Sequence, residues 1–290
     1  MADVTETIGV EPALSEVEGS SAGEAEAPAS RPTGLRAFYR KHENTILPLT
    51  TVVVFFAAWE LVAGLGLIRP LLISSPSRIL KAAVWLFEHG FWNDILVSAN
   101  EFGVGFALSV VIGIPLGILM GWYRRLNVMF DPFISALYAM PRIALLPILI
   151  LWLGIGIESK IAVVFLGAFF PMLVSTMAGM KTIDESLLKC ARSFGARDRQ
   201  VFTTLALPGS VPFIITGMRL GMGRGLVGVV VGELVASNAG VGYVMSLAGA
   251  TFQTDKVYVG ILILALTGYV LVEVLKWLEA RFESWRPERG

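Results

Sequence analysis

The stretch KCARSFGARDRQVFTTLALP, residues 189–208, is polar and basic, and strongly apolar segments flank it on both sides. Good helix formers occupy Ser186 to Phe194, and a second helical pattern runs from Arg197 to Leu205. Gly195 separates the two, and glycine can end a helix because it adopts positive φ angles readily. Pro208 and Pro212 suit the start of a further helix. The stretch therefore predicts a helix-turn-helix outside the bilayer, although a plain basic loop would also fit.

The composition is that of a polytopic membrane protein. Of 290 residues, 55% are hydrophobic and 16% are charged, whereas soluble domains have roughly 45–50% and 25%. Six apolar stretches are each long enough to cross a bilayer as a helix. They lie near residues 46–67, 94–121, 128–153, 159–180, 211–236 and 257–279. Residues 76–90 instead predict an amphipathic helix at the membrane interface.

Several classes of function are disfavoured. The formal net charge is zero, which gives no nucleic-acid footprint. The single cysteine, Cys190, allows no disulfide within the chain, and His42 and His89 lie outside the apolar stretches. No nucleophile–base pair or metal-ligand set stands out, so we expect no catalytic residue and no metal site. No lysine follows a glycine, which excludes a Walker A loop. An ATPase that drives this protein would be another chain.

The chain divides into a tail, a membrane domain and a second tail. Residues 1–44 form a predicted disordered acidic tail with a basic juxtamembrane end, residues 45–280 the membrane domain, and residues 281–290 a cytoplasmic tail. Within the membrane domain, residues 181–210 form the longest cytoplasmic loop. Of the 23 Lys and Arg residues, fifteen lie on one predicted side and five on the other. These five are Arg69, Arg78, Lys81, Lys160 and Lys256. The asymmetry predicts that both termini are cytoplasmic.

Small residues recur every four positions in two of the spans. Such faces let helices approach one another closely in lipid. The second span carries Gly113, Gly117 and Gly121, and the fifth carries Gly217, Gly221 and Gly225. We expect these faces to serve helix packing and no chemistry.

Ionisable residues within the spans are candidates for a pathway, because charge at the bilayer centre costs at least about 2.5–3.5 kcal/mol. The residues are Glu60, Glu101, Arg142, Arg219, Arg224 and Glu233. Arg142 follows Pro141, where a broken helix is tolerated beside a cavity. Arg142 or Arg224 would line the pathway and attract an anion, or would pair internally with Glu101 or Glu233. Both alternatives remain open from the sequence.

The segment 189–208 resembles the loop shared by the membrane subunits of ABC importers. That loop reads Glu-Ala-Ala, three residues, Gly, nine residues, Ile, one residue, Leu-Pro. Ala191, Gly195, Leu207 and Pro208 match it, and Leu205 is a conservative change, whereas Lys189 and Cys190 depart from it. Residues 131–184 and 217–245 are similar to permeases of the nitrate/sulfonate/taurine import group. The resemblance covers about residues 45–280.

The resemblance implies an all-α membrane protein of the type I importer kind, with six transmembrane helices, an interfacial helix and a cytoplasmic coupling helix. It implies a non-catalytic permease in the inner or plasma membrane of a prokaryote. Its partners would be a second copy, two cytosolic ATPases that hold ATP and Mg, and a periplasmic or lipid-anchored solute-binding protein. This chain would itself bind no cofactor. The residues of the loop that would contact the ATPase are Glu185, Lys189, Ala191, Arg192, Gly195, Arg197, Leu207 and Pro208.

The solute implied by the resemblance is a small anion such as nitrate, a sulfonate or taurine. Glu101 stands where related permeases often carry Arg, and Arg224 where they often carry an aromatic residue. A neutral or zwitterionic solute, such as a pyrimidine vitamin precursor or a flavin, is therefore the alternative. A secondary transporter or a channel is a more remote one, because neither needs a segment that docks an ATPase.

Overall fold

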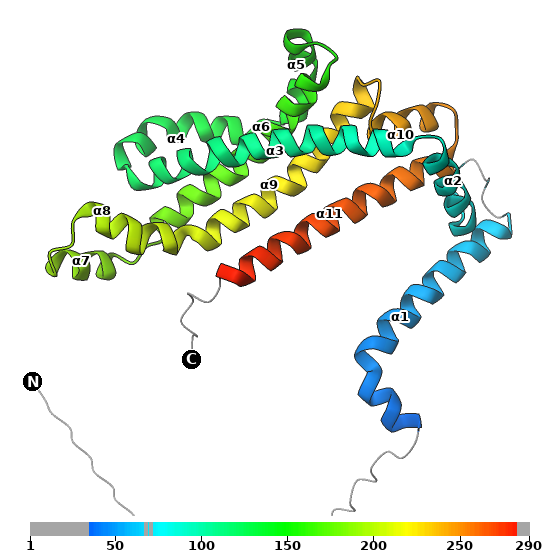
Figure 1. The fold of residues 1–290 in the computed structure, drawn as a ribbon, viewed down its shortest axis with the longest axis horizontal. Helices are drawn as coiled ribbons and strands as arrows, with labels where there is room; N and C mark the ends of the chain where they lie inside the picture. The colour runs from blue at the N-terminus through cyan, green and yellow to red at the C-terminus, as the bar shows by residue number, and fades with distance from the viewer. Residues whose placement is uncertain (1–34, 67–68, 70–71, 283–290) are drawn as a thin grey trace, which may run out of the picture. The chain divides into compact units, whose positions relative to one another are not determined.

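The computed structural model describes residues 35–66, 69 and 72–282, with side chains from Leu47 to Ala280. Most of the predicted acidic tail and the last eight residues lie outside these ranges. The chain forms two units, residues 1–54 and 55–290. The regular elements of the described part are helices throughout (Figure 1).

The membrane domain has five helices long and apolar enough to span a bilayer, and a sixth span if one bent pair is counted. The helices are α1 (Leu35–Gly64), α2 (Pro76–Glu88), α3 (Phe91–Trp122), α4 (Arg124–Ala139), the 3₁₀ turn η1 (Arg142–Leu145), α5 (Leu146–Leu153), α6 (Ile157–Lys181), α7 (Glu185–Ser193), α8 (Asp198–Val201), the π-helical turn η2 (Phe202–Ala206), α9 (Leu207–Val235), α10 (Val241–Ala250) and α11 (Thr254–Phe282). This arrangement confirms the predicted all-α membrane fold.

The glycine face of α3 packs directly on α6. A Cβ atom added at Gly117 would lie 2.7 Å from the Leu173 carbonyl oxygen and from Thr176 Cβ, and one at Gly113 would lie 3.2 Å from Phe169. Only glycine permits this approach, because the obstructing atoms include backbone atoms that cannot move aside. The close approach gives the van der Waals contact on which helix association in lipid depends.

The glycine face of α9 packs on α6 in the same way. Added Cβ atoms at Gly217 and Gly221 would lie 3.1 Å from Met172 Cα and 2.9 Å from the Ala168 carbonyl oxygen, respectively. The helix α6 is thus held between α3 and α9, and the side chains of Ala168 and Met172 are fully buried. The predicted packing role of both glycine faces is confirmed.

The third expected span is broken rather than straight. The helices on either side of Met140 and Pro141 are bent by 88°. Proline disfavours helical conformation in the residue before it and lacks an N–H for the helix ladder. Met140 accordingly has an extended backbone, with φ −66° and ψ 137°. The break places Tyr138 and Arg142 on opposite sides of the bend.

The amphipathic helix α2 forms as predicted. Ser75 caps it by accepting a hydrogen bond from the Arg78 N–H at 3.4 Å, and Pro76 occupies its first turn. Ile79 and Leu86 are buried in a cluster with Val259 of α11. The Glu60 carboxylate also accepts hydrogen bonds from the N–H and the hydroxyl of Ser77, at 3.0 and 2.7 Å. The in-span Glu60 therefore serves the start of α2.

We predict that Gly117→Ala destabilises the membrane domain by about 1–3 kcal/mol, because its methyl group would overlap the backbone of α6. Gly103→Ala on the same helix is the control, since a Cβ there meets nothing within 4 Å. Unfolding in mixed detergent micelles, followed by circular dichroism, measures both. Equal stability of the two variants would contradict close α3–α6 packing.

Candidate functional site

The helix α7 is capped at its start by an aspartate. Asp184 Oδ1 accepts a hydrogen bond from the Ser186 N–H at 2.7 Å. Hydrogen bonds from the side chain and backbone of Ser186 lower the pKa of Asp184 below its ordinary value. Because the folded pKa is the lower one, this cap stabilises α7 at neutral pH and is lost only as the pH falls through that lowered pKa. The loop helix is therefore well defined under physiological conditions.

The end of α7 is a Schellman turn built on two residues of the matched motif. The N–H of Ala196 donates to the Ala191 carbonyl at 3.1 Å, and the N–H of Gly195 donates to the Arg192 carbonyl at 2.9 Å. This pair of bonds requires a left-handed residue after the helix end. Gly195 supplies it with φ +79°. The turn fixes the direction in which the chain leaves α7.

Two ion pairs reinforce this turn. Lys189 Nζ lies 3.5 Å from a Glu185 carboxylate oxygen one helical turn earlier. Arg192 Nη2 lies 3.6 Å from Asp198 Oδ1, which joins α7 to the first turn of α8. All four side chains are exposed, so each pair contributes little to stability. Lys189, which departs from the family pattern, thus has a partner on its own helix.

The helix that begins at Asp198 does not stop before Pro208. Arg197 precedes it, and the Arg197 N–H donates to the Gln200 side-chain oxygen at 2.8 Å. From Asp198 the helical path runs through α8, η2 and α9 to Val235. The expected new start at Pro208 and Pro212 is therefore corrected. The span extends into the loop as one helical column (Figure 1).

The π-helical turn η2 explains how Pro208 is accommodated. A proline inside an α-helix removes one N–H and pushes its ring against the carbonyl of the fourth residue back. Widening the preceding turn to π geometry relieves that clash. Accordingly, the Leu207 N–H reaches back five residues to the Phe202 carbonyl. The Leu207–Pro208 pair of the motif therefore marks this wide turn within a continuous helix.

A cavity of about 570 Å³ opens beside the broken span. Its size falls within the range of small-molecule sites, roughly 300–1,000 Å³. The walls come from the bend between α4 and α5, from α6 and from α9. They include Tyr138, Pro141, Arg142, Arg219, Gly223 and Arg224. Two of the four predicted intramembrane residues, Arg142 and Arg224, therefore line one cavity.

The two arginines share one aromatic ring. The guanidinium carbon of Arg142 lies 5.1 Å from the centroid of the Tyr138 ring, and that of Arg224 lies 5.3 Å from it. Arg142 Nη2 also donates to the Tyr138 carbonyl at 2.6 Å. Among the described residues, neither arginine lies within ion-pair distance of a carboxylate. Arg219, in contrast, is bonded to Glu279 of α11.

Glu101 and Glu233 lie elsewhere, in a buried polar cluster with Lys160 and Ser98. Glu101, Lys160 and Glu233 are only 2%, 2% and 1% exposed. The Glu233 carboxylate accepts a hydrogen bond from Ser98, whereas Oε2 of Glu101 has no hydrogen-bond partner among the described residues. Lys160 Nζ donates to the carbonyls of Ile155 and Gly156. The sequence analysis counted Lys160 among the five charges on the side opposite the cytoplasm, whereas the structure buries its side chain.

Glu233 holds the start of α10. Its carboxylate accepts hydrogen bonds from the Gly242 N–H at 2.6 Å and from the Ser98 hydroxyl at 2.5 Å. Ser98 in turn accepts from the Val241 N–H at 2.9 Å. A carboxylate is favoured at a helix N-terminus, where free N–H groups and the helix dipole attract negative charge. Glu233 therefore ties α9 to α3 and α10.

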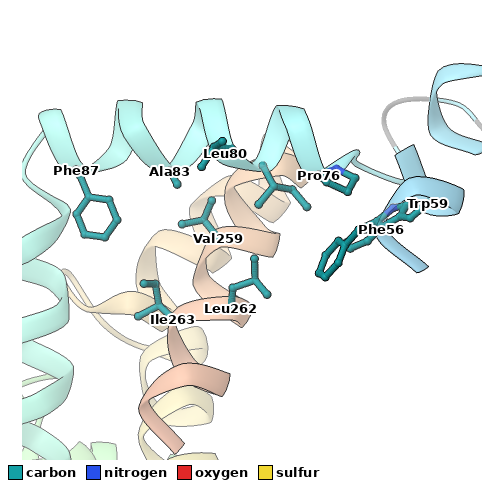
Figure 2. A pocket seen from close by; sticks show the side chains of 10 residues that line it. Phe56, Trp59, Pro76, Leu80, Ala83, Phe87, Val259, Leu262 and Ile263 are labelled. Carbon is teal, nitrogen blue, oxygen red and sulfur yellow. The ribbon is translucent and has the colours of Figure 1, made fainter. Parts of the chain in front are cut away.

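A second pocket, of about 220 Å³, lies between α1, α2 and α11 (Figure 2). In the figure, Leu80 and Phe87 approach it from α2, Val259 and Ile263 from α11, and Phe56 from α1. The lining residues carry no charged group that could orient a polar solute. This pocket therefore suits hydrocarbon contact and is no candidate for the solute pathway.

Sequence reasoning missed Tyr138 and Ser98. Ser98 is a small residue within a predicted span, and the sequence pattern gave no signal for it. Tyr138 had a weak signal, since it lies one helical turn before Arg142 and next to a predicted break. An aromatic ring so placed can stack on a guanidinium group.

Comparison with known proteins gives the family. A model described as the binding-protein-dependent transport system inner membrane component matches residues 113–284. The chain belongs to this family. The permease is 34% identical to the taurine transport system permease protein TauC of Escherichia coli K12, over 83% of this chain and 90% of TauC. It is 33% identical to the putative aliphatic sulfonates transport permease protein SsuC of Bacillus subtilis, over 85% and 90% of the two chains.

Two further comparisons bear on the solute and the fold. The permease is 32% identical to the formylaminopyrimidine transport permease protein ThiX of Halalkalibacterium halodurans, over 88% of this chain and all of ThiX. It also resembles an inward-facing MetNI methionine ABC transporter structure, with a TM-score of 0.51, 20% identity and coverage of 66% and 96%. That likeness concerns the fold. The chain is an ABC importer permease, a non-catalytic membrane subunit.

We predict that Glu233→Ala destabilises the permease by about 1–3 kcal/mol for each donor left unpaired, because the Gly242 N–H and the Ser98 hydroxyl would lose their acceptor. Glu158→Ala is the control, because Glu158 is an exposed carboxylate in the first turn of α6. Thermal unfolding in detergent measures both. A Glu233→Ala protein as stable as the control would show that the carboxylate does not hold α10.

Proposed function

We propose that this permease and a second copy of it form the translocation pathway of an ATP-driven importer. Two cytosolic ATPase subunits, which hold ATP and Mg, and an extracytoplasmic solute-binding protein complete the assembly. The family description, a binding-protein-dependent transport system component, supports the last of these. The chain itself contributes the pathway and the surface on which the ATPase docks.

The observation that carries the proposal is the exposed segment formed by α7 and α8. Leu187 and Phe194 on and next to α7 are 53% and 88% exposed, although both are large and apolar. Exposed apolar side chains on an ordered helix are typical of a protein-binding surface. The segment lies at one end of α9, and α10 lies at the other (Figure 1). A partner docked on α7 would thus act on the span through α8.

We place the permease in the inner or plasma membrane of a prokaryote, with both termini and α7 on the cytoplasmic side. The distribution of Lys and Arg supports this orientation. The buried Lys160 is removed from the five charges counted for the other side, which strengthens the asymmetry. Cytosolic ATPases would then find α7, Arg124 and Arg125 on their side of the membrane.

Transport would proceed by alternating access. ATP closure of the two ATPases would move the docked α7, and the helical column from Asp198 would carry that motion to the cavity beside Arg224. An equilibrium shifts only through contacts that differ between the two states. The stiff Schellman turn suits this role, because a loose linker would absorb the motion.

The favoured solute is a small organic anion of the sulfonate or taurine kind. Two relatives are named for taurine and aliphatic sulfonates. The relative named for formylaminopyrimidine favours the second candidate, a neutral or zwitterionic vitamin precursor. The two arginines without ion-pair partners in the described cavity favour the anion, because a neutral solute would not offset their charge.

Co-expression of the chain with a cognate ATPase and binding protein tests the proposal by native mass spectrometry. We expect a particle with two permeases and two ATPases. Replacing the exposed Leu187 and Phe194 together by alanine should remove the ATPases, because the docking surface loses its apolar side chains. Leu72→Ala is the control, since Leu72 is a large apolar residue that is 70% exposed outside the loop.

The binding protein then reports the solute, through mass spectrometry of the small molecule that it retains. A sulfonate would support the favoured solute, and a pyrimidine would support the second candidate. Permease that is stable alone and never captures an ATPase would overturn the proposed function.

A further inference from the structure

The cavity between the broken span and α9 is lined by the guanidinium groups of Arg142 and Arg224, and neither has a carboxylate partner among the described residues. The rings of Tyr138 and Phe170 contact Arg142, with centroids 5.1 and 5.3 Å from its guanidinium carbon. Tyr138 also contacts Arg224. The face of an aromatic ring attracts a guanidinium group that lies over it. Such contacts position both groups and leave the N–H donors at their edges available.

Several of these donors lack a partner. Arg142 Nε is buried and has none among the described residues, and only Nη2 of this side chain donates, to the Tyr138 carbonyl. Arg224 makes no hydrogen bond or ion pair within the described part of the chain. A buried donor without an acceptor, as at Arg142 Nε, is unfavourable because it has lost its hydrogen bond to water. A ligand that brings acceptor oxygens would recover this free energy.

The two guanidinium groups carry like charges and lie against the same Tyr138 ring, so they repel each other. An anion bound between them would offset this repulsion. Glu101 and Glu233 do not supply this negative charge, because neither forms an ion pair with Arg142 or Arg224, and Glu233 is hydrogen-bonded by Ser98 and Gly242 instead. Arg219, which also lines the cavity, is paired with Glu279.

The face of α9 that carries Arg224 is open. Leu220, Gly223, Arg224 and Val227 recur at helical spacing and are all exposed, whereas the glycine face of the same helix packs on α6. Arg224 lies about 16 Å from the Val235 end of the helix at 1.5 Å per residue, and a charge that faces lipid at such a depth is strongly unfavourable. This face borders the cavity, since all four of these residues line it.

We infer that Arg142 and Arg224, set by the ring of Tyr138, form a binding site in the permease for a single oxyanion group, a sulfonate or a carboxylate. The inference rests on the proposed transport function and deepens it. Guanidinium edges match the paired oxygens of such a group and form charge-assisted hydrogen bonds with it. The permease thus selects for negative charge within the membrane, independently of the binding protein.

Binding of methanesulfonate to the purified permease, followed by saturation-transfer NMR on its methyl group, tests the site. Dimethyl sulfone is the matched neutral probe, since it has a similar shape without the charge. We expect methanesulfonate to bind and dimethyl sulfone not to compete. Arg142→Gln and Arg224→Gln should each weaken binding about tenfold to a hundredfold, the range for a lost charge-assisted hydrogen bond.

Two variants control this experiment. Arg125→Gln removes the same charge from an exposed position outside the cavity lining and should bind as the unmodified protein does. Arg224→Lys keeps the charge and should bind better than Arg224→Gln, which separates loss of charge from loss of fold. Unchanged binding in both Gln variants, or equal competition by dimethyl sulfone or chloride, would overturn the site.

The outcome is separable from that of the proposed function. An assembly that captures the ATPases while its permease binds no methanesulfonate would leave the importer and refute the oxyanion site. A permease that binds methanesulfonate but never captures an ATPase would do the reverse.

Discussion

The continuous helix from Asp198 to Val235 is the constraint on which the account depends. One end of this column joins, through Gly195, an exposed helix, and its middle carries an arginine of the cavity. The helix is continuous across Pro208 because the Leu207 N–H in this segment bonds to the carbonyl five residues back instead of four. The wider π-helical turn η2 removes the clash that proline would otherwise cause. A helix resists bending far more than a loop does, so a displacement at α7 would be transmitted along the axis. The proposed docking surface and the cavity are connected through this helix.

The helix α6 provides a closely packed surface beside the continuous helix Asp198–Val235. Glycines of α3 and α9 bring backbones into contact with α6 on two sides, which leaves the opposite face of α9 free to border the cavity. The same helix therefore has a fixed side and an open side. At its far end, Glu233 joins α9 to α3 and α10 through hydrogen bonds from Ser98 and Gly242. The packing contacts and the cavity-lining residues of α9 therefore lie on the same helix, only a few residues apart.

Much of this was legible in the sequence. Apolar length, glycine spacing and the left-handed requirement at Gly195 are local properties, and the structure bears them out. The break at Pro141 was also visible, because proline restricts its neighbour. The π turn was not, since Pro208 suits a helix start as well as a widened turn, and only the tertiary path decides between them.

The charges were the least predictable part. Lys160 near a span end resembles a solvated loop residue, yet its side chain is buried and its ammonium group donates to the carbonyls of Ile155 and Gly156. Glu101 and the two cavity arginines all look alike in sequence, as isolated charges in apolar runs. Which of them meet depends on the rotation of α3, α6 and α9 about their axes, and residue spacing along one helix carries no information on that.

The most direct test of the central claim is the ratio of solute taken up to ATP hydrolysed by the complete transporter in proteoliposomes, using the solute that the binding protein retains. Thr203 and Thr204 are exposed in η2, so replacing both by glycine softens the column without removing packing. The double alanine variant is the control. The account predicts that the glycine variant still captures ATPases and hydrolyses ATP but takes up several-fold less solute per ATP. An unchanged ratio would contradict a rigid helical connection between the docking surface and the cavity.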